Sequence, residues 1–117
     1  MHITLTGSHG FIGTHLRKHL EDNGHTVECW DLLINKDIVN FEIDPASDVC
    51  IHLAAKADIR ESFTNPDLYW NENVVKCRTV FDKCAEHNIR IIYASSSACL
   101  EWHRNPYALS KYVDEFM

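Results

Sequence analysis

The sequence predicts an α/β fold in which a small parallel sheet, with about four strands, carries helices on both faces. Short runs rich in β-branched and aromatic residues alternate with segments whose apolar residues recur at helical spacing. This alternation is typical of parallel, doubly wound sheets, because each strand returns to the sheet through a helix. At 117 residues, the chain is expected to form one domain, residues 1–117.

The elements follow from local composition. Strands are expected at 3–6, 25–30, 48–55 and 88–94, where Val, Ile, Leu and Tyr are concentrated. Helices are expected at 11–20, at 66–86 and from Pro106 onward. Asn23 and Gly24 end the first helix as a C-cap pair. The first strand, first helix and second strand therefore form a βαβ unit that closes at Asp31.

Charge and cysteine usage exclude several classes of partner. The net charge is −6 and no basic run occurs, which argues against nucleic acid and against an anionic membrane. No stretch approaches the roughly 18 apolar residues of a membrane span, and no signal peptide is recognised. The cysteines lie far apart without a C-x-x-C pair, which predicts free thiols and a cytoplasmic location. They are Cys29, Cys50, Cys77, Cys84 and Cys99.

A glycine-rich segment joins the first strand to the first helix, Thr6-Gly7-Ser8-His9-Gly10-Phe11-Ile12-Gly13. Gly7 would allow a tight turn, Gly10 a close approach of backbone to a pyrophosphate, and Gly13 close packing of helix on sheet. Phosphates would then lie at the amino terminus of the helix. A loop that serves only chain reversal is the alternative. The position between a strand and a helix favours a dinucleotide site.

Asp31 bears on the choice of dinucleotide. It ends the second strand about 20 residues after the glycines, the offset at which an acidic residue hydrogen-bonds a ribose 2′-hydroxyl. Its carboxylate would repel a 2′-phosphate, and no arginine lies between Asp31 and Asp37. We therefore expect NAD rather than NADP. A solvated, structural Asp31 remains the alternative.

Two further groups of residues suggest proton chemistry. Tyr107 and Lys111 are four residues apart on the last predicted helix, so they share a face. An ammonium beside a phenol favours the phenolate that a general base requires. Ser97 closes a serine run just beyond the 88–94 strand, at the carboxyl end of the sheet, where open α/β sheets bind ligands. Each signal alone is weak.

Together these segments resemble the extended short-chain dehydrogenase/reductase family. Within it they are most similar to the NAD-dependent epimerase/dehydratase branch, particularly the nucleotide-sugar epimerases that act on UDP-galactose and UDP-glucuronate. The resemblance implies a Rossmann-type fold, NAD as cofactor and a nucleotide-sugar substrate. The matching segments are 6–13, Asp31, Asp37-Ile38, 52–55, Ser62, Asn65-Pro66, Asn73, 95–98 and 107–111.

The resemblance also implies residue roles. Ser97 would hydrogen-bond the reacting sugar oxygen, Tyr107 would move its proton, and Lys111 would orient the cofactor ribose and tune Tyr107. The cofactor-binding residues would be Gly7, Gly10 and Gly13 in the turn, Phe11 and Ile12 at the pyrophosphate, Asp31 at the adenosine ribose, Asp37 and Ile38 at the adenine, Leu53, Ala54 and Ala55 at the nicotinamide-side ribose, Asn73 as a brace, and Tyr107 and Lys111.

The sequence departs from the family pattern in three places. The segment between Asp31 and Asp37 is short enough to be a loop, where a helix and a strand are usual. The loop between Ser97 and Tyr107 is also short. The carboxyl-terminal part that would bind the nucleotide sugar is not found, so the substrate domain is expected to be absent.

Two hypotheses for function follow. In the first, the chain is a minimal NAD-dependent epimerase that uses Ser97, Tyr107 and Lys111; a dehydratase is less favoured because Ala98 and Cys99 follow the serines. In the second, it is an NAD-binding module whose catalysis is lost or completed by another chain. We also expect a homodimer or higher homo-oligomer formed through the 66–86 and final helices. No metal site is predicted, because His15 and His19 share a helix face without a third ligand.

Overall fold

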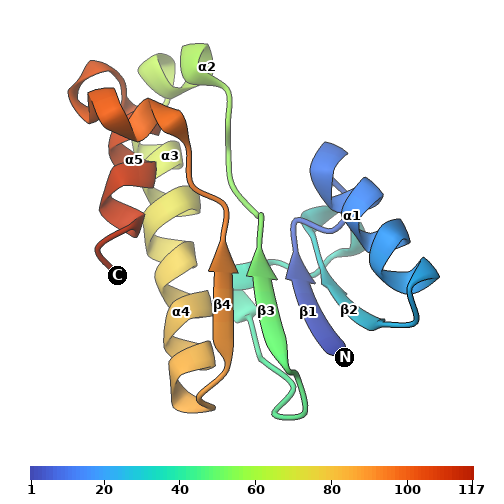
Figure 1. The fold of residues 1–117 in the computed structure, drawn as a ribbon. Coiled ribbons are helices and arrows are strands. Elements are labelled where there is room, and N and C mark those ends of the chain that lie inside the picture. Colours follow the sequence, from blue (N-terminus) through green and yellow to red (C-terminus); the bar gives the residue numbers. More distant parts are fainter. The chain divides into compact units, whose positions relative to one another are not determined.

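The computed structural model describes residues 1–117, which divide into two compact units. Unit 1 comprises Met1–Ala54 and Thr79–Ala94, and unit 2 comprises Ala55–Arg78 and Ser95–Met117. The boundary between Arg78 and Thr79 falls inside the helix α4 (Lys76–Glu86), which is labelled in Figure 1. This helix therefore contributes residues to both units.

Unit 1 is built on a parallel sheet with the strand order β2-β1-β3-β4 (Figure 1). The strands are β1 (His2–Thr6), β2 (Thr26–Trp30), β3 (Val49–His52) and β4 (Arg90–Tyr93). The parallel α/β class predicted from the sequence is confirmed. β4 is the outermost strand, and its Ile92 is 44% exposed.

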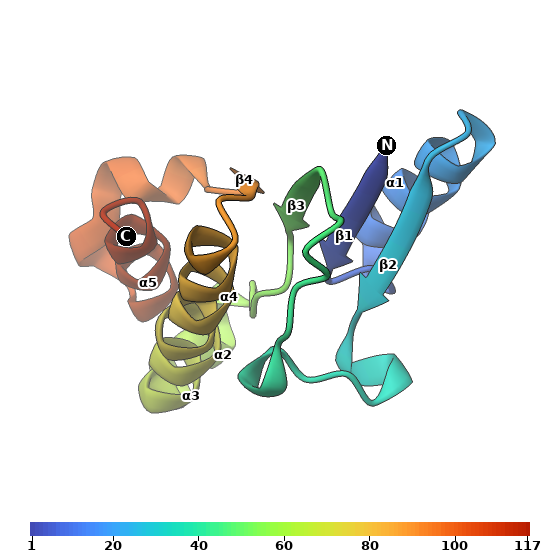
Figure 2. The same cartoon turned by 90° about the horizontal axis from the view of Figure 1, so that it is seen from below.

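Each face of this sheet packs against a helix. α1 (Phe11–Asp22) places Leu16 and Leu20 against a buried cluster on one face, Ile3, Leu5, Val49 and Ile51. On the other face, Val80 and Cys84 of α4 pack against Trp30, Phe41 and Cys50. Side chains of a strand alternate between its faces, so β3 sends Val49 and Ile51 one way and Cys50 the other. The sheet therefore has a helix on each face, as predicted. Figure 2 shows α1 on its side of the sheet.

The segment between β2 and β3 contains only two short 3₁₀ turns, η1 (Leu32–Ile34) and η2 (Ile38–Asn40). Asp31 and Asp37 cap these turns by accepting bonds from the amides of Leu33 and Val39. Asx caps of this kind satisfy backbone amides that no helix or sheet would satisfy. The expected shortening of this segment to a loop is thus seen directly.

Unit 2 is helical. It contains α2 (Ile59–Thr64), α3 (Pro66–Trp70), the π-helical segment η3 (Asn71–Val75), the start of α4, the 3₁₀ segment η4 (Ser97–Arg104) and α5 (Pro106–Asp114). Pro66 and Pro106 lie in the first turns of α3 and α5, where the missing amide hydrogen costs nothing. The 66–86 helix predicted from the sequence is helical throughout, with a π segment in its middle.

Two findings concern the whole chain. All five cysteines are free. None of the helices combines the length and the apolar character that crossing a bilayer requires.

Candidate functional site

In unit 1, the turn between β1 and α1 is defined by close backbone approaches. Gly7 has φ +69°, and a Cβ there would lie 2.8 Å from the amide nitrogen of Ala54. A Cβ on Gly13 would lie 1.9 Å from the carbonyl oxygen of Gly7. A Cβ on Gly10 would meet only that same oxygen, at an ordinary 3.5 Å. The fold therefore requires glycine at 7 and 13, whereas at position 10 the protein itself leaves room.

The amino terminus of α1 opens beside this turn. Gly10 is its N-cap, provides no side-chain cap, and the first turn carries no acidic residue. The first amides of a helix have no partner within it and favour negative charge. Phe11 and Ile12 are 84% and 65% exposed, so this end of the helix is accessible. Amides in this arrangement can donate to an anion such as a pyrophosphate.

Asp31 anchors the glycine turn. One carboxylate oxygen accepts a hydrogen bond from the His9 amide and the other from the Leu33 amide, both at 2.9 Å. Each carboxylate oxygen has a second lone pair, so Asp31 can still accept a bond from a ribose hydroxyl. Nearby, the ammonium of Lys36 lies 5.2 Å from the ring centroid of Trp30. Asp31 thus has a structural role that the sequence left open, and this role is compatible with ligand binding.

Thr6 is a site residue that the sequence reasoning did not single out. Its buried hydroxyl accepts bonds from the amides of Leu53 and Ala54, at 3.1 and 3.2 Å. The same hydroxyl lies 2.6 Å from Nδ1 of His52, to which it can donate its proton. Thr6 therefore holds the 53–54 segment beside the glycine turn. The sequence did contain a signal for Thr6, because Thr6 and His52 belong to the segments 6–13 and 52–55 that match the family pattern.

Asp37 and Ile38 are positioned differently from each other. Asp37 is half-buried and accepts a bond from the Val39 amide, at 3.0 Å. The Ile38 side chain is only 6% exposed and belongs to the cluster around Trp30 and Phe41. A ligand at this point would meet the backbone of Ile38 rather than its side chain. Ala55 is exposed and lies in unit 2.

In unit 2, α5 carries Tyr107 and Lys111. The half-buried ring of Tyr107 packs edge-on against Tyr69, with centroids 6.5 Å apart. Lys111 is only 5% exposed, and burial lowers the pKa of its ammonium, an effect opposed by the negative charge of Asp114. Ser97 begins η4 and is exposed. The unit thus contains a buried cation, a phenol and an accessible hydroxyl.

A buried hydrogen-bond chain fixes the start of α5. The Asn73 side chain accepts a bond from the Lys56 amide at 2.7 Å and donates to the Lys56 carbonyl at 2.9 Å. It also donates to the Ser110 hydroxyl at 3.1 Å, and that hydroxyl donates to the carbonyl of Tyr107 at 2.7 Å. Asn73 therefore joins the 56 segment to the turn of α5 that carries Tyr107. The sequence offered Ser110 as part of a motif but gave no sign of this role.

Unit 2 also has a largely apolar groove of about 580 Å³. Trp70 and Trp102 are 45% and 43% exposed there. The Trp102 ring stacks on Tyr112, with centroids 5.4 Å apart and planes 14° apart. The principal apolar lining residues are Phe63, Pro66, Trp70, Trp102, Pro106 and Leu109.

The sheet and the glycine turn define a Rossmann-type α/β protein. The model of the NAD dependent epimerase/dehydratase family matches residues 3–115, and the chain belongs to this family.

The individual relatives share only about a quarter to a third of their residues with this chain. Protein CapI of Staphylococcus aureus is 30% identical over 97% of this chain and 43% of its own length. UDP-glucose 4-epimerase of Caenorhabditis elegans is 26% identical over 98% of this chain and 48% of its own length. The structure of UDP-glucose 4-epimerase from Brucella ovis in complex with NAD has a TM-score of 0.84 and 25% identity, covering 99% of this chain and 46% of that one. The chain thus spans about half the length of the relatives it matches.

Proposed function

We propose that residues 1–117 form an NAD-binding domain, with the glycine turn of unit 1 holding the pyrophosphate. The observation that carries this proposal is the contrast among the three glycines. Gly7 and Gly13 are required by the fold itself, whereas a Cβ at Gly10 would find room. Glycine at position 10 is explained by a ligand that needs the space beside the uncapped amino terminus of α1.

The preference for NAD over NADP is assigned to Asp31. Its carboxylate would accept a bond from the 2′-hydroxyl and repel a 2′-phosphate. Lys36, the one basic residue between Asp31 and Asp37, lies over Trp30. Asp37 and the backbone of Ile38 would meet the adenine, and Leu53, Ala54 and Ala55 the other ribose.

Calorimetric titration of NAD and NADP tests this assignment. Asp31→Asn removes the charge and keeps an acceptor for only one of the two amides that Asp31 holds, His9 or Leu33, so the NAD/NADP affinity ratio is the readout, because loosening of the turn would weaken both ligands alike. We expect the NAD/NADP affinity ratio to fall by about tenfold or more, since a hydrogen bond to a charged group contributes about 1.5–3 kcal/mol. Lys36→Ala is the matched control and should leave the ratio unchanged. Equal or tighter binding of NADP by the parent chain would refute the preference.

The chemistry we propose is that of a nucleotide-sugar epimerase. When bound, NAD would accept a hydride from a sugar carbon and return it to the opposite face. Tyr107 would take the proton of the reacting sugar hydroxyl, and Ser97 would hydrogen-bond the same oxygen. Lys111 would orient the cofactor ribose and favour the phenolate of Tyr107 through its charge. The named activity of the C. elegans and B. ovis relatives supports this substrate class.

Turnover of UDP-glucose to UDP-galactose tests this chemistry. Tyr107→Phe deletes one hydroxyl and should lower turnover by about 10²–10⁴-fold, the usual contribution of a general base, with NAD affinity unchanged. Tyr112→Phe, on the same helix, is the control and should retain activity. If NAD binds but no UDP- or dTDP-sugar is converted, the second candidate holds: an NAD-binding module whose catalysis is lost or completed by another chain.

We further propose a homodimer formed through the apolar surface of unit 2. Trp70, Val75 and Phe116 are 45%, 50% and 74% exposed, and exposed apolar patches mark protein interaction sites. Sedimentation equilibrium should show a dimer, and Phe116→Glu should dissociate it, because a charge would be buried at the interface. Val113 is partly buried within unit 2, so a charged substitution there would disturb the fold of the unit as well as a dimer interface. A monomeric parent chain would contradict the proposal.

A further inference from the structure

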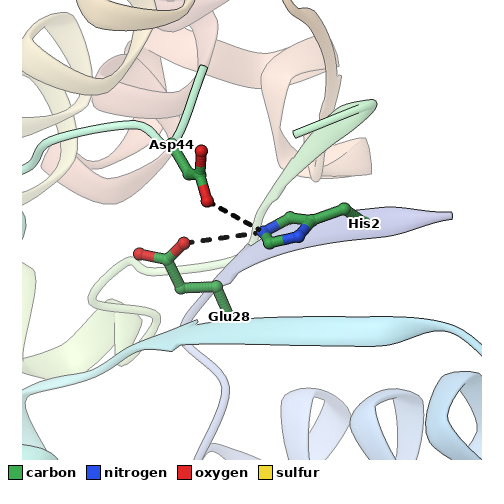
Figure 3. Close-up of side chains that lie close together, drawn as sticks. All are labelled: His2, Glu28 and Asp44. Carbon is green, nitrogen blue, oxygen red and sulfur yellow. Dashed lines mark ion pairs between the residues drawn. The ribbon is translucent and has the colours of Figure 1, made fainter. Parts of the chain in front are cut away.

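We propose that His2, Glu28 and Asp44 form a binding site for a divalent transition-metal ion, with Zn²⁺ as the ion tested. His2 begins β1, Glu28 lies on β2, and Asp44 lies in the segment before β3, so three separate parts of unit 1 meet here (Figure 3). His2 Nε2 lies 3.7 Å from Glu28 Oε2 and 3.7 Å from Asp44 Oδ2. All three ligand atoms lie within 4.8 Å of one another.

The imidazole nitrogen at the centre of this cluster lacks a hydrogen-bond partner. His2 Nε2 is shielded from solvent and has no donor or acceptor at bonding distance, although the two carboxylates face it. Buried polar atoms are normally satisfied, so each exception calls for a physical reason. A metal ion between the nitrogen and the two carboxylate oxygens would satisfy all three atoms.

Both carboxylates are oriented by groups outside the cluster. The indole nitrogen of Trp30 donates to Glu28 Oε1 at 3.4 Å, and the Ala46 amide donates to Asp44 Oδ1 at 2.8 Å. In each case one oxygen is held and the other faces His2. The His2 amide donates to Asp48 at 2.7 Å, which fixes the start of β1. Outer hydrogen bonds of this kind orient metal ligands.

The donor set and spacing suit zinc. Imidazole nitrogen and carboxylate oxygen bind Zn²⁺ at about 2.0–2.2 Å, which places tetrahedral ligand atoms about 3.3–3.5 Å apart. The 3.7 Å separations would close by a few tenths of an ångström, a small shift for two carboxylates that are each held through one oxygen only. Water would complete the coordination. Because His2 lies at the opposite end of β1 from Thr6 and the glycine turn, the ion would clamp β1, β2 and the 44 segment without touching the proposed NAD site.

Calorimetric titration of ZnCl₂ into the chelator-treated chain is the first test. We expect one equivalent to bind and the melting temperature to rise, because an ion that binds only the folded state stabilises it. His2→Gln should weaken binding by at least about tenfold, and Glu28→Gln should do the same with imidazole intact. His15→Gln and His19→Gln are matched controls, since these residues share a helix face at ligand spacing, and they should leave affinity unchanged.

Nitrogen chemical shifts of the histidines give an independent readout. Zn²⁺ should move the Nε2 resonance of His2 and leave those of His15 and His19 in place. Saturable binding that survives His2→Gln, or that disappears in the His15→Gln and His19→Gln controls, would overturn the proposal. So would the absence of saturable binding. NAD affinity with and without Zn²⁺ should be equal.

Discussion

The glycine turn of unit 1 and the start of α5 in unit 2 are held in place by different physics. In the glycine turn, backbone meets backbone, and a single added methyl group at Gly13 would come within 1.9 Å of a carbonyl oxygen. At the start of α5, side chains do the positioning, through the bonds that join Lys56, Asn73, Ser110 and Tyr107. The glycine turn depends on the absence of side-chain atoms, whereas the start of α5 depends on polar groups that must all be present.

This difference decides how each region fails. Added volume in a close backbone contact has nowhere to go, so substitution should unfold the turn. Removal of one polar group from a buried network leaves its partners unsatisfied, and the cost depends on how many bonds are lost. Substitutions can therefore separate the two cases quantitatively.

Gly13→Ala should give the largest loss of stability. The new Cβ would force the Gly7 carbonyl and the start of α1 apart, and we expect the free energy of unfolding to fall by about 3 kcal/mol or more. Gly10→Ala, with a Cβ at an ordinary 3.5 Å, should cost less than about 1 kcal/mol while weakening NAD binding. Urea unfolding monitored by circular dichroism measures both. Equal losses for the two variants would contradict the steric account.

Asn73→Ala should have the next largest effect. It removes three hydrogen bonds and leaves the Lys56 amide and carbonyl unsatisfied, which predicts a loss of about 2–4 kcal/mol. Asn71→Ala, at an exposed position of the same helical run, should change stability by less than about 0.5 kcal/mol. A small effect of Asn73→Ala in the same urea experiment would show that the network does not position α5.

Trp102→Ala should cost about 1 kcal/mol, the contribution of one aromatic pair, because its ring stacks on Tyr112 but is 43% exposed. Leu100→Ala serves as the control, since Leu100 is 87% exposed. Thermal unfolding of both variants measures the difference. A Trp102 effect as small as that of Leu100 would mean that the stack contributes nothing.

The smallest effect concerns titration of two lysines. Burial lowers the pKa of Lys111, whereas the hydrogen bond to Asp22 raises that of exposed Lys18. Below its lowered pKa, folded Lys111 carries a disfavoured charge, so its contribution to stability should increase as pH rises through that pKa toward 10.5. The Lys18 contribution should instead be lost as pH rises through its raised pKa. Nuclear magnetic resonance of the lysine side chains should therefore find Lys111 titrating first, and the reverse order would refute the burial effect.

Much of the fold was predictable because its signals are local. The strands are short runs rich in β-branched and aromatic residues, and all of them occur where expected, with ends displaced by a few residues. The third strand shows why the ends differ: expected at 48–55, it stops at His52. The Leu53 amide then divides its bond between the carbonyl and the hydroxyl of Thr6, and the Ala54 amide bonds to that hydroxyl alone. α2 and η4 were not predicted, since both are short and depend on the side-chain caps of Asp58 and Ser96.

In the candidate site, too, the features with a local sequence signal could be predicted and those that depend on distant partners could not. The glycine turn could be predicted because its glycine spacing lies within eight consecutive residues, between a strand and a helix. The roles of Thr6 and Ser110 depend on partners far along the chain, Leu53 and Asn73, and no periodicity encodes such pairs. His2, Glu28 and Asp44 are an extreme case: none follows a metal-binding spacing, and only the sheet brings them together. The roles of Ser97, Tyr107 and Lys111 and the cytoplasmic location stay predictions.

Because the segment Asn71–Val75 is π-helical, the number of residues in it matters as well as their identity. Each α-helical residue turns the helix by about 100°, so deleting one residue here to restore a regular α-helix would rotate everything before it relative to everything after it. Tyr69, now fully buried, would leave its place opposite Tyr107. Insertions and deletions should therefore be tolerated in the exposed 32–36 loop, where no helix phase depends on them, and not between residues 71 and 75.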